Sequence, residues 1–307
     1  MTKVAIDKMK SDIDHVLQSH YSDDFKSGTA YIGSGLDFCA FKGSHAIWGS
    51  VVVKAPWKRI IQNENDPYQD TLDLLRQEGF LMEYLGKFDF PVPEFRELVQ
   101  SDLIDYPLLI CDYVPTDATT PKQGEVGALL DKLHCIPVPN YQLVAQEGLN
   151  WKSLLAKRII RRLHAICAIT NTSLGFLTQD DLEKSLQREG NLSNSCILHM
   201  DIRPENFRMK AGKIQALIDW GNALIGHPIL EWMRVHEYGD LGKPFDNGYP
   251  ISVEMAECPE VLNHICCLDT AAMLTLVFLS ESPDQVLAKK WIKRTEFLIK
   301  IIEMHHR

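Results

Sequence analysis

The sequence lacks several features that would place it in a specialised class of protein. Its eight cysteines include no C-x-x-C pair, and no unbroken apolar run approaches the roughly 18 residues of a membrane-spanning helix. Met1 to Ala5 lack the apolar core of a signal peptide, and we find neither internal repeats nor low-complexity segments. We therefore expect reduced thiols, a cytoplasmic location and no contact with a membrane.

A basic surplus is also absent. The chain carries 32 Lys and Arg against 41 Asp and Glu, a formal net charge of −9. Nucleic-acid-binding proteins are usually basic, so we do not expect nucleic acid as a partner. Residues 1–115 hold 18 acidic and 11 basic side chains, so most of the acidic excess lies in this part of the chain. Net charge is therefore a poor guide to a substrate bound by the later residues.

The chain has 307 residues, of which 45% are hydrophobic, and this is enough for two lobes. Strand patterns dominate up to about residue 113, and long helical patterns follow. We predict an α+β fold with lobes at 1–113 and 114–307, joined by a connection at about 110–115. The helices are expected at 9–21, 71–85, 124–135, 151–169, 178–189, 228–238, 260–280 and 284–305. The strands are expected at 29–32, 38–41, 46–54, 95–99, 106–114, 207–209 and 213–218.

The most informative motif is His199-Met200-Asp201-Ile202-Arg203-Pro204-Glu205-Asn206, followed by Asp219. In phosphoryl transfer, a carboxylate accepts the proton of the attacking hydroxyl, and an amide with a second carboxylate holds Mg²⁺ on the nucleotide. Asp201 suits the first task, and Asn206 and Asp219 suit the second.

The segment between Asn206 and Asp219 predicts a hairpin with a tight turn at Ala211-Gly212. If Lys210 pairs with Lys213, Asn206 lies opposite Leu217, and Asp219 shares the face of Leu217. Diagonal neighbours of this kind are about 7–8 Å apart, which lets two side chains share a metal. The alternative is a hairpin whose acidic and amide side chains are only solvated.

Two upstream features fit a nucleotide site. Gly33-Ser34-Gly35 lies between two predicted strands, where backbone N–H groups can approach phosphates closely, although such glycines can also serve only a turn. Glu78 lies within an apolar helical stripe, and a buried carboxylate needs a cation. Lys54, at the end of the preceding strand, is the obvious partner. Alternatively, Glu78 reaches solvent at the edge of the stripe.

These residues occur in the order found in the protein-kinase-like fold. The sequence most resembles the aminoglycoside phosphotransferases and the choline kinase-like small-molecule kinases. The finer likeness is carried by Gly33 to Asp37, Pro91-Val92-Pro93, Leu130 to His134, Ile218-Asp219-Trp220 and Gly226-His227-Pro228. The resemblance implies a small, mainly antiparallel β lobe and a larger helical lobe.

The resemblance also implies roles for single residues. Asp201 resembles the catalytic base, and Arg203 resembles a residue that contacts the γ-phosphate. Lys54 and Glu78 resemble the clamp on the α- and β-phosphates.

By the same resemblance, the backbone at Asp112 and Val114 is expected to meet the nucleobase. Glu231 stands where the family has an acid that braces the catalytic loop. Two positions depart from the family pattern: Met200 replaces a common Gly, and His227 replaces a common Asp.

We therefore expect a Mg²⁺-dependent enzyme that moves the γ-phosphate of ATP or GTP to a hydroxyl of a small molecule. An aminoglycoside, another antibiotic, an amino alcohol and a sugar all remain possible acceptors. One alternative is a protein kinase, but Gly226-His227-Pro228 follows Asp219 too closely for a long activation segment. Another is a non-catalytic nucleotide-binding scaffold.

The sequence offers one candidate acceptor pocket after Asp219. Its residues are Trp232, Glu237, Tyr238, Asp240, Phe245, Asp246 and Tyr249. The alternative is a solvated acidic loop with packed aromatic side chains.

Overall fold

The computed structural model describes residues 3–25, 28–66, 68–188, 195–239, 242–250 and 258–305. The chain forms two compact units. The first consists of Met1–Gln62, Tyr68–Thr120 and Glu205–Gly221, and the second consists of Asn63–Pro67, Pro121–Pro204 and Asn222–Arg307. The sequence predicts contiguous lobes. In the structure, the segment that holds Asn206 and Asp219 belongs to the first unit.

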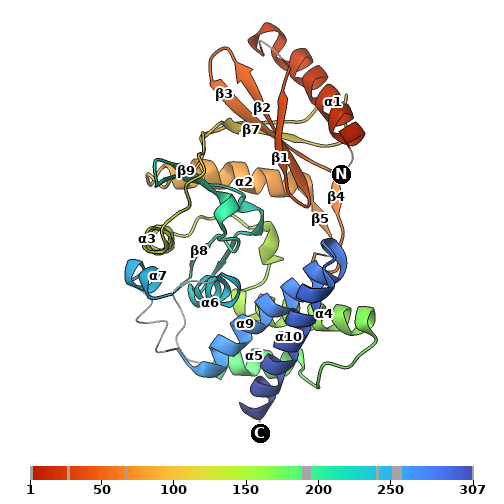
Figure 1. Cartoon of the computed structure of the whole chain (residues 1–307), viewed down its shortest axis with the longest axis vertical. Helices are drawn as coiled ribbons and strands as arrows, with labels where there is room; N and C mark the ends of the chain where they lie inside the picture. The colour runs from red at the N-terminus through yellow and green to blue at the C-terminus, as the bar shows by residue number, and fades with distance from the viewer. Residues whose placement is uncertain are drawn as a thin grey trace. The chain divides into compact units, whose positions relative to one another are not determined.

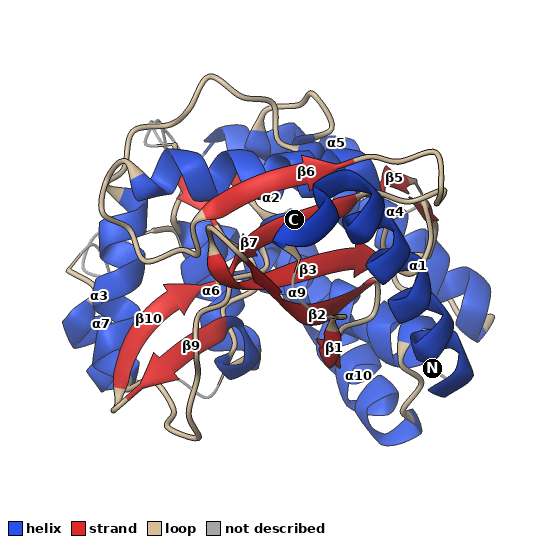
Figure 2. Cartoon of the chain, turned by 90° about the horizontal axis from the view of Figure 1, so that it is seen from above, coloured by secondary structure: helices blue, strands red, loops and turns tan. Residues whose placement is uncertain are grey.

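The first unit is built on a sheet. Its strands β1 (Ala30–Ser34), β2 (Phe38–His45), β3 (Gly49–Pro56), β7 (Leu108–Asp112) and β6 (Phe95–Val99) are hydrogen-bonded in that order (Figure 2). Every neighbouring pair is antiparallel, as expected for a β lobe. The same unit contains α1 (Lys3–Tyr21), α2 (Thr71–Gly86), β4 (Ile60–Ile61), β5 (Gln69–Asp70), β9 (Phe207–Lys210) and β10 (Lys213–Leu217).

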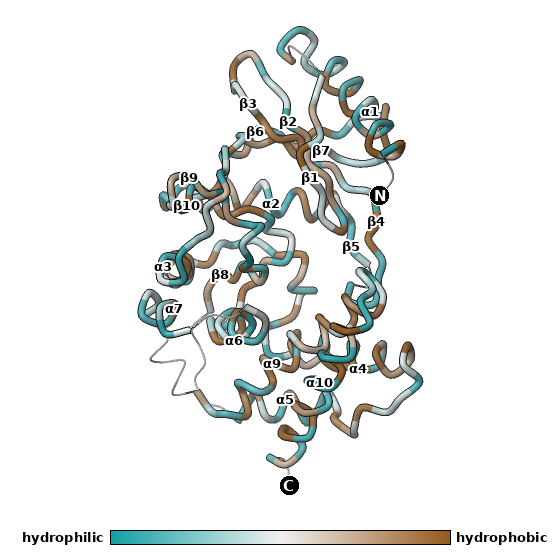
Figure 3. The backbone as a smooth tube through the Cα atoms, in the orientation of Figure 1, coloured by the Kyte–Doolittle hydropathy of each residue, from teal (hydrophilic) through white to brown (hydrophobic). Residues whose placement is uncertain are grey.

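A helix covers each face of this sheet because the central strands are apolar on both faces. Along β7, Leu108 and Ile110 belong to the cluster formed with α1, whereas Leu109 and Cys111 belong to the cluster formed with α2. Side chains alternate along a strand, so neighbouring residues enter opposite clusters. The hydrophobic colouring of β7 in Figure 3 therefore reflects a strand that is buried on both sides.

Helix α2 matches its predicted position. Its N-cap is Asp70, whose side chain accepts a hydrogen bond of 2.8 Å from the backbone N–H of Leu72. This satisfies one of the donors that a helix leaves free at its start. The helix runs to Gly86, and its buried stripe places Glu78 inside the unit.

The second unit is mainly helical. It contains α3 (Gln123–His134), α4 (Trp151–Thr170), α5 (Gln179–Arg188), β8 (Cys196–Leu198), β11 (Leu224–Gly226), α6 (Ile229–Tyr238), α7 (Lys243–Gly248), α9 (Glu260–Leu276) and α10 (Gln285–His305) (Figure 1). Its core joins buried residues of α4, α5, α6, α9 and α10.

Helix α7 lies very close to α3. A Cβ added at Gly127 would lie 2.3 Å from the carbonyl oxygen of Phe245, and one added at Gly248 would lie 2.1 Å from that of Gly124. Because real Cβ atoms do not approach backbone so closely, only glycine fits at these two positions.

Helix α9 bears on the expectation that no helix spans a membrane. Among the described residues, the stretch Glu260–Glu281 is long and apolar enough to cross a membrane, although its apolar residues form no unbroken run. About 61% of its most apolar window is buried inside the protein, and Asp269 at its centre pairs with Arg162. A core helix has the same properties, and α9 packs against α4, α6 and α10.

The sequence missed the shortest elements. Strands β4, β5, β8 and β11 have only two or three residues each, and α7 has six. Segments this short carry too few residues to show a period.

Candidate active site

The centre of the candidate site is Lys54 on β3. Its Nζ donates to Glu78 Oε2 at 2.7 Å and to Asp219 Oδ1 at 2.9 Å. The backbone N–H of Asp219 also donates to the Glu78 carboxylate. Glu78 is 3% exposed. The predicted contact between Lys54 and Glu78 is therefore present, and Asp219 joins it.

Burial and charge act in opposite directions on this group. Burial alone would lower the pKa of Lys54, but the charges of Asp219 and Glu78 outweigh it and raise the pKa above its usual value. Burial raises the pKa of Glu78, and the positive charge of Lys54 opposes that shift. Lys54 therefore stays protonated and offers a fixed positive charge, which is what an anionic phosphate needs.

Helix α2 also holds the segment after Asp219, a contact that the sequence did not predict. Gln77 Nε2 donates to the carbonyl oxygens of Trp220 at 2.8 Å and Gly221 at 3.2 Å. The Trp220 side chain is fully buried and packs edge-on against Phe90. Gln77 and Glu78, which are adjacent on α2, thus hold the backbone at Asp219 and at the two residues that follow it.

The hairpin β9–β10 differs from its predicted register. Lys210 pairs with Lys213 as expected, but a bulge at Gln215 shifts the pairing, so that Leu217 lies opposite Phe207 instead of Asn206. Strand β10 then ends at Leu217, and Asp219 adopts a left-handed backbone with φ 70°. A bulge adds one residue to one strand, so the predicted alternation of faces does not reach Asp219.

Asn206 lies directly before β9. Its side chain is buried, and its carbonyl oxygen accepts a 3.0 Å hydrogen bond from the N–H of Ile218. This bond ties the Asn206 backbone to the residue before Asp219. The described residues contain no group of three or more His, Cys, Asp or Glu side chains that could hold a metal. An amide and a carboxylate form a smaller oxygen set, which suits Mg²⁺ shared with phosphates.

The glycine segment forms the end of β1 and the turn that follows. Gly33 and Ser34 close the strand, and Gly35 N–H donates to Phe38 O at 2.8 Å across a tight turn. A Cβ added at Gly33 or Gly35 would meet nothing within 4 Å. Packing within the chain therefore does not require glycine at either position, and the backbone is open to a ligand.

Strand β7 ends at the predicted base-binding backbone. Asp112 N–H donates to Glu94 O at 2.9 Å, so a base contact at this residue would use its carbonyl oxygen. The Asp112 carboxylate is held by Arg96 through bonds of 2.7 and 2.9 Å. Val114 lies beyond the end of the strand and is partly exposed. The bracing by Arg96 was not predicted.

The second unit carries Asp201. Its N–H donates to His199 Nδ1 at 3.2 Å, and its Oδ2 lies 3.1 Å from Arg203 Nε. The Asp201 side chain is 15% exposed and that of Arg203 is 47% exposed. A solvated arginine beside a carboxylate of this kind can move without much loss of stability.

The backbone before Asp201 is held by a buried chain of hydrogen bonds. Met200 adopts a left-handed backbone with φ 64°, and its N–H donates to Glu231 Oε1. The other oxygen of Glu231 lies 2.8 Å from His134 Nε2, and His134 Nδ1 bonds the Tyr249 hydroxyl. Burial would raise the pKa of Glu231, but the bond from His134 and its charge lower it, so Glu231 is ionised. Glu231 therefore braces this loop.

The family model of the phosphotransferase enzyme family, APH, matches residues 51–254, which is more than half of the chain. The chain belongs to this family. The match includes Lys54, Glu78, Asp201, Asn206 and Asp219. No curated protein matches the sequence significantly.

Solved structures of several small-molecule kinases share the fold. A candidate fructosamine-3-kinase from Haemophilus somnus is 16% identical, with a TM-score of 0.65 and 98% and 99% of the two chains covered. A candidate aminoglycoside phosphotransferase from Ralstonia eutropha is 14% identical, with a TM-score of 0.61 and 94% and 95% covered. A thermostable mutant of aminoglycoside phosphotransferase APH(4)-Ia, in complex with ADP and hygromycin B, is 12% identical, with a TM-score of 0.61 and 94% and 98% covered. The predicted α+β kinase-like fold is confirmed.

His227 is one of the two positions at which the sequence departs from the expected family pattern. Its Nδ1 accepts a 3.3 Å hydrogen bond from the N–H of Ile229 at the start of α6. Burial, together with the charges of Lys152 and His134, lowers the pKa of His227 to about 4. The neutral ring thus supplies the acceptor that an Asp carboxylate would supply at a helix start.

Two of the three carboxylates expected in an acceptor pocket, Glu237 and Asp246, already have partners. Glu237 accepts bonds of 2.6 and 2.8 Å from Arg294. Asp246 accepts from Trp232 Nε1 at 3.2 Å and lies 3.1 Å from His236 Nε2. The side chains of Phe245 and Tyr249 are fully buried. Asp240 and the side chain of Tyr238 lie outside what the structure describes. The packed alternative therefore fits these residues better than an open pocket for an amine.

Proposed function

We propose that this protein transfers the γ-phosphate of ATP or GTP to a hydroxyl group of a small molecule, with Mg²⁺ as its metal. The proposal rests mainly on the position of Lys54, whose ammonium is held by Glu78 and Asp219 at 2.7 and 2.9 Å. A buried cation fixed by two carboxylates, beside an open glycine turn on the same sheet, suits the binding of phosphates.

Each polar residue then has a defined task. Lys54 holds the α- and β-phosphates, and Glu78 orients Lys54. Backbone N–H groups of Gly33, Ser34 and Gly35 approach the phosphates. Bound Mg²⁺ would be held by Asn206 and Asp219 and would neutralise charge on the phosphates.

Asp201 accepts the proton of the acceptor hydroxyl as the hydroxyl oxygen attacks the γ-phosphorus, and the bond from that phosphorus to the β-phosphate oxygen breaks to release the nucleoside diphosphate. Arg203 can leave Asp201 and neutralise charge on the transferred group, because it is half exposed. Glu231 keeps the Asp201 loop in place through the Met200 N–H. Most of the rate acceleration then comes from positioning and from fixed charges.

The acceptor is proposed only as a hydroxylated small molecule, such as an antibiotic, an amino alcohol or a sugar. The pairing of Glu237 with Arg294 gives no support to a polycationic acceptor bound by that carboxylate. A protein substrate is disfavoured because α6 begins at Ile229, only ten residues after Asp219, and this leaves little chain for a peptide platform.

The experiment is an acceptor screen that follows nucleotide consumption and the mass of the product. We expect one class of hydroxylated compound to gain the mass of a phosphoryl group, and we expect this gain to vanish in Asp201→Asn. A scaffold would bind Mg²⁺-nucleotide but transfer phosphate to no acceptor. A product formed equally well by Asp201→Asn would refute the role of this residue.

A further inference from the structure

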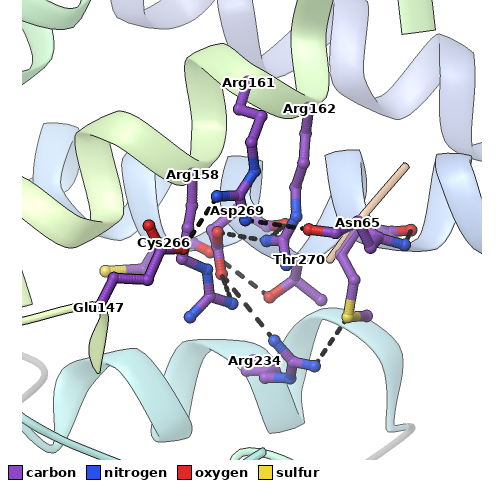
Figure 4. Close-up of polar contacts among 10 residues, drawn as sticks. Asn65, Glu147, Arg158, Arg161, Arg162, Arg234, Cys266, Asp269 and Thr270 are labelled. Carbon is purple, nitrogen blue, oxygen red and sulfur yellow. Dashed lines mark hydrogen bonds and ion pairs between the residues drawn. The ribbon is translucent and has the colours of Figure 1, made fainter. Parts of the chain in front are cut away.

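A group of buried arginines lies in the second unit, apart from the residues used above. Arg158 and Arg162 extend from α4, Arg234 extends from α6, and Asp269 extends from α9 (Figure 4). Arg162, Arg234 and Asp269 are 3%, 4% and 2% exposed. Three guanidinium groups thus surround one carboxylate inside the helical core.

Asp269 cannot satisfy all three arginines. Arg162 Nη1 donates to Asp269 Oδ1 at 2.6 Å, which is a normal charge-assisted hydrogen bond. Arg158 and Arg234 share the other oxygen at 3.4 and 3.9 Å, which is too long for bonds of that strength. The second carboxylate oxygen is therefore contacted loosely from two sides.

Arg234 is the least satisfied member of the group. Within the described part of the chain, its only hydrogen-bond acceptor is the thioether sulfur of Met273, at 2.7 Å from Nη2. Its Nε and Nη1 have no hydrogen-bond partner there, and neither does Nε of Arg162. A thioether is a weak acceptor, and a buried guanidinium without an oxygen acceptor is strongly destabilising.

The carboxylates near these arginines do not cancel their positive charge. Burial, together with the neighbouring charges of Arg158 and Arg234, lowers the pKa of Arg162 to about 10, although the carboxylates of Asp269 and Asp66 oppose this shift. The carboxylates of Asp269 and Asp66 supply two negative charges against the three positive charges of the arginines, so a net positive charge remains. Arg161 is not counted in this group, because it pairs with Glu147 at 2.8 Å and donates to the Asn65 carbonyl oxygen at 2.9 Å.

We propose that a small inorganic anion of the size of chloride binds among Arg234, Arg162 and Arg158. It would accept hydrogen bonds from the unpartnered Arg234 Nε and Nη1 and would balance the buried positive charge. The anion joins α4 and α6 of the second unit, so its role is to stabilise the fold. The inference does not depend on the proposed phosphotransfer.

The test compares the thermal midpoint of the whole protein in sodium chloride and in sodium gluconate at equal ionic strength. Gluconate is too large for a buried site, and equal ionic strength keeps screening constant. We expect a saturable rise with chloride of about 3 °C at about ten times the dissociation constant. Arg234→Met should abolish this rise, and Arg76→Met, which removes an exposed arginine of α2, should retain it.

A second measurement tests the proposal even if Arg234→Met does not fold. Crystals of the unaltered protein soaked in sodium bromide should show an anomalous peak within hydrogen-bonding reach of the Arg234 guanidinium. Equal midpoints in the two salts, or only ordered water beside Arg234, would overturn the proposal.

Discussion

The contact between Lys54 and Glu78 allows a quantitative test, because both groups are buried and their distance is short. The side chains are 14% and 4% exposed, and the two atoms are 2.7 Å apart. Hydrogen bonds to charged groups contribute about 1.5–3 kcal/mol, so Glu78→Gln or Lys54→Met should lower kcat/KM for the nucleotide by about 10–150-fold.

The double variant is the decisive member of the series. Removal of either partner already releases the other, so the second substitution should add little. If the losses were additive, the double variant would lose about 10²–10⁴-fold, whereas we expect it to stay within about threefold of the worse single variant. The coupling energy in the cycle should therefore be about 1.5–3 kcal/mol.

The free energy of unfolding of the same variants provides a second test. Lys54→Met leaves Glu78 buried beside Asp219 without a cation, and loss of one partner of a buried pair costs about 3–5 kcal/mol. Glu78→Gln should cost less, because Lys54 keeps its 2.9 Å contact with Asp219. Urea unfolding of the variants measures this order.

The control pair lies on the same helix. Arg76 and Asp73 are 3.2 Å apart and about half exposed, so Arg76→Met and Asp73→Asn should leave kcat/KM unchanged. If the losses at Lys54 and Glu78 add to within about 0.5 kcal/mol, the two residues do not act together on the nucleotide, and the reasoning is refuted.

Three further predictions concern single residues. Asp201→Asn should fold and bind nucleotide normally but turn over about 10²–10⁴ times more slowly, and near-normal steady-state turnover would remove it as the base. Asp219→Ala should abolish the Mg²⁺ dependence of nucleotide binding in a metal titration, and an unchanged dependence would place the ligand elsewhere. His227 has a folded pKa of about 4, below its ordinary value of about 6.5, so the unfolded chain binds more protons between these values and stability falls as pH falls. His227→Asn keeps an acceptor but does not titrate. Urea unfolding should show the native protein losing about 2 kcal/mol more than His227→Asn between pH 7 and pH 5, and equal losses would contradict the depressed pKa.

Features within one element were predicted well from the sequence. The apolar stripe of α2 places Glu78 on its buried face, and the structure confirms both the helix and the contact with Lys54. The helical period of the apolar residues alone places Glu78 on the buried face. A buried carboxylate then requires a cation nearby. The sequence also gave the boundaries of α2 and β6 to within a residue.

Features that depend on a backbone irregularity or on distant contacts were not predicted. The bulge at Gln215 follows from no clear residue signal, and it moves Leu217 opposite Phe207. Gln77 could not be distinguished from any other polar residue of α2, because its partners are backbone carbonyls 143 and 144 residues away. The arginines around Asp269 were missed for the same reason, since they and Asp269 come from three helices that only the tertiary fold brings together.

The most direct test of the central claim is a crystal structure of the unaltered protein with Mg²⁺ and a non-hydrolysable ATP analogue. The account predicts that Lys54 Nζ contacts the α- and β-phosphates while Glu78 still holds it, and that Asn206 and Asp219 coordinate the metal. A nucleotide whose phosphates lie away from Lys54, or a metal bound by neither Asn206 nor Asp219, would contradict it.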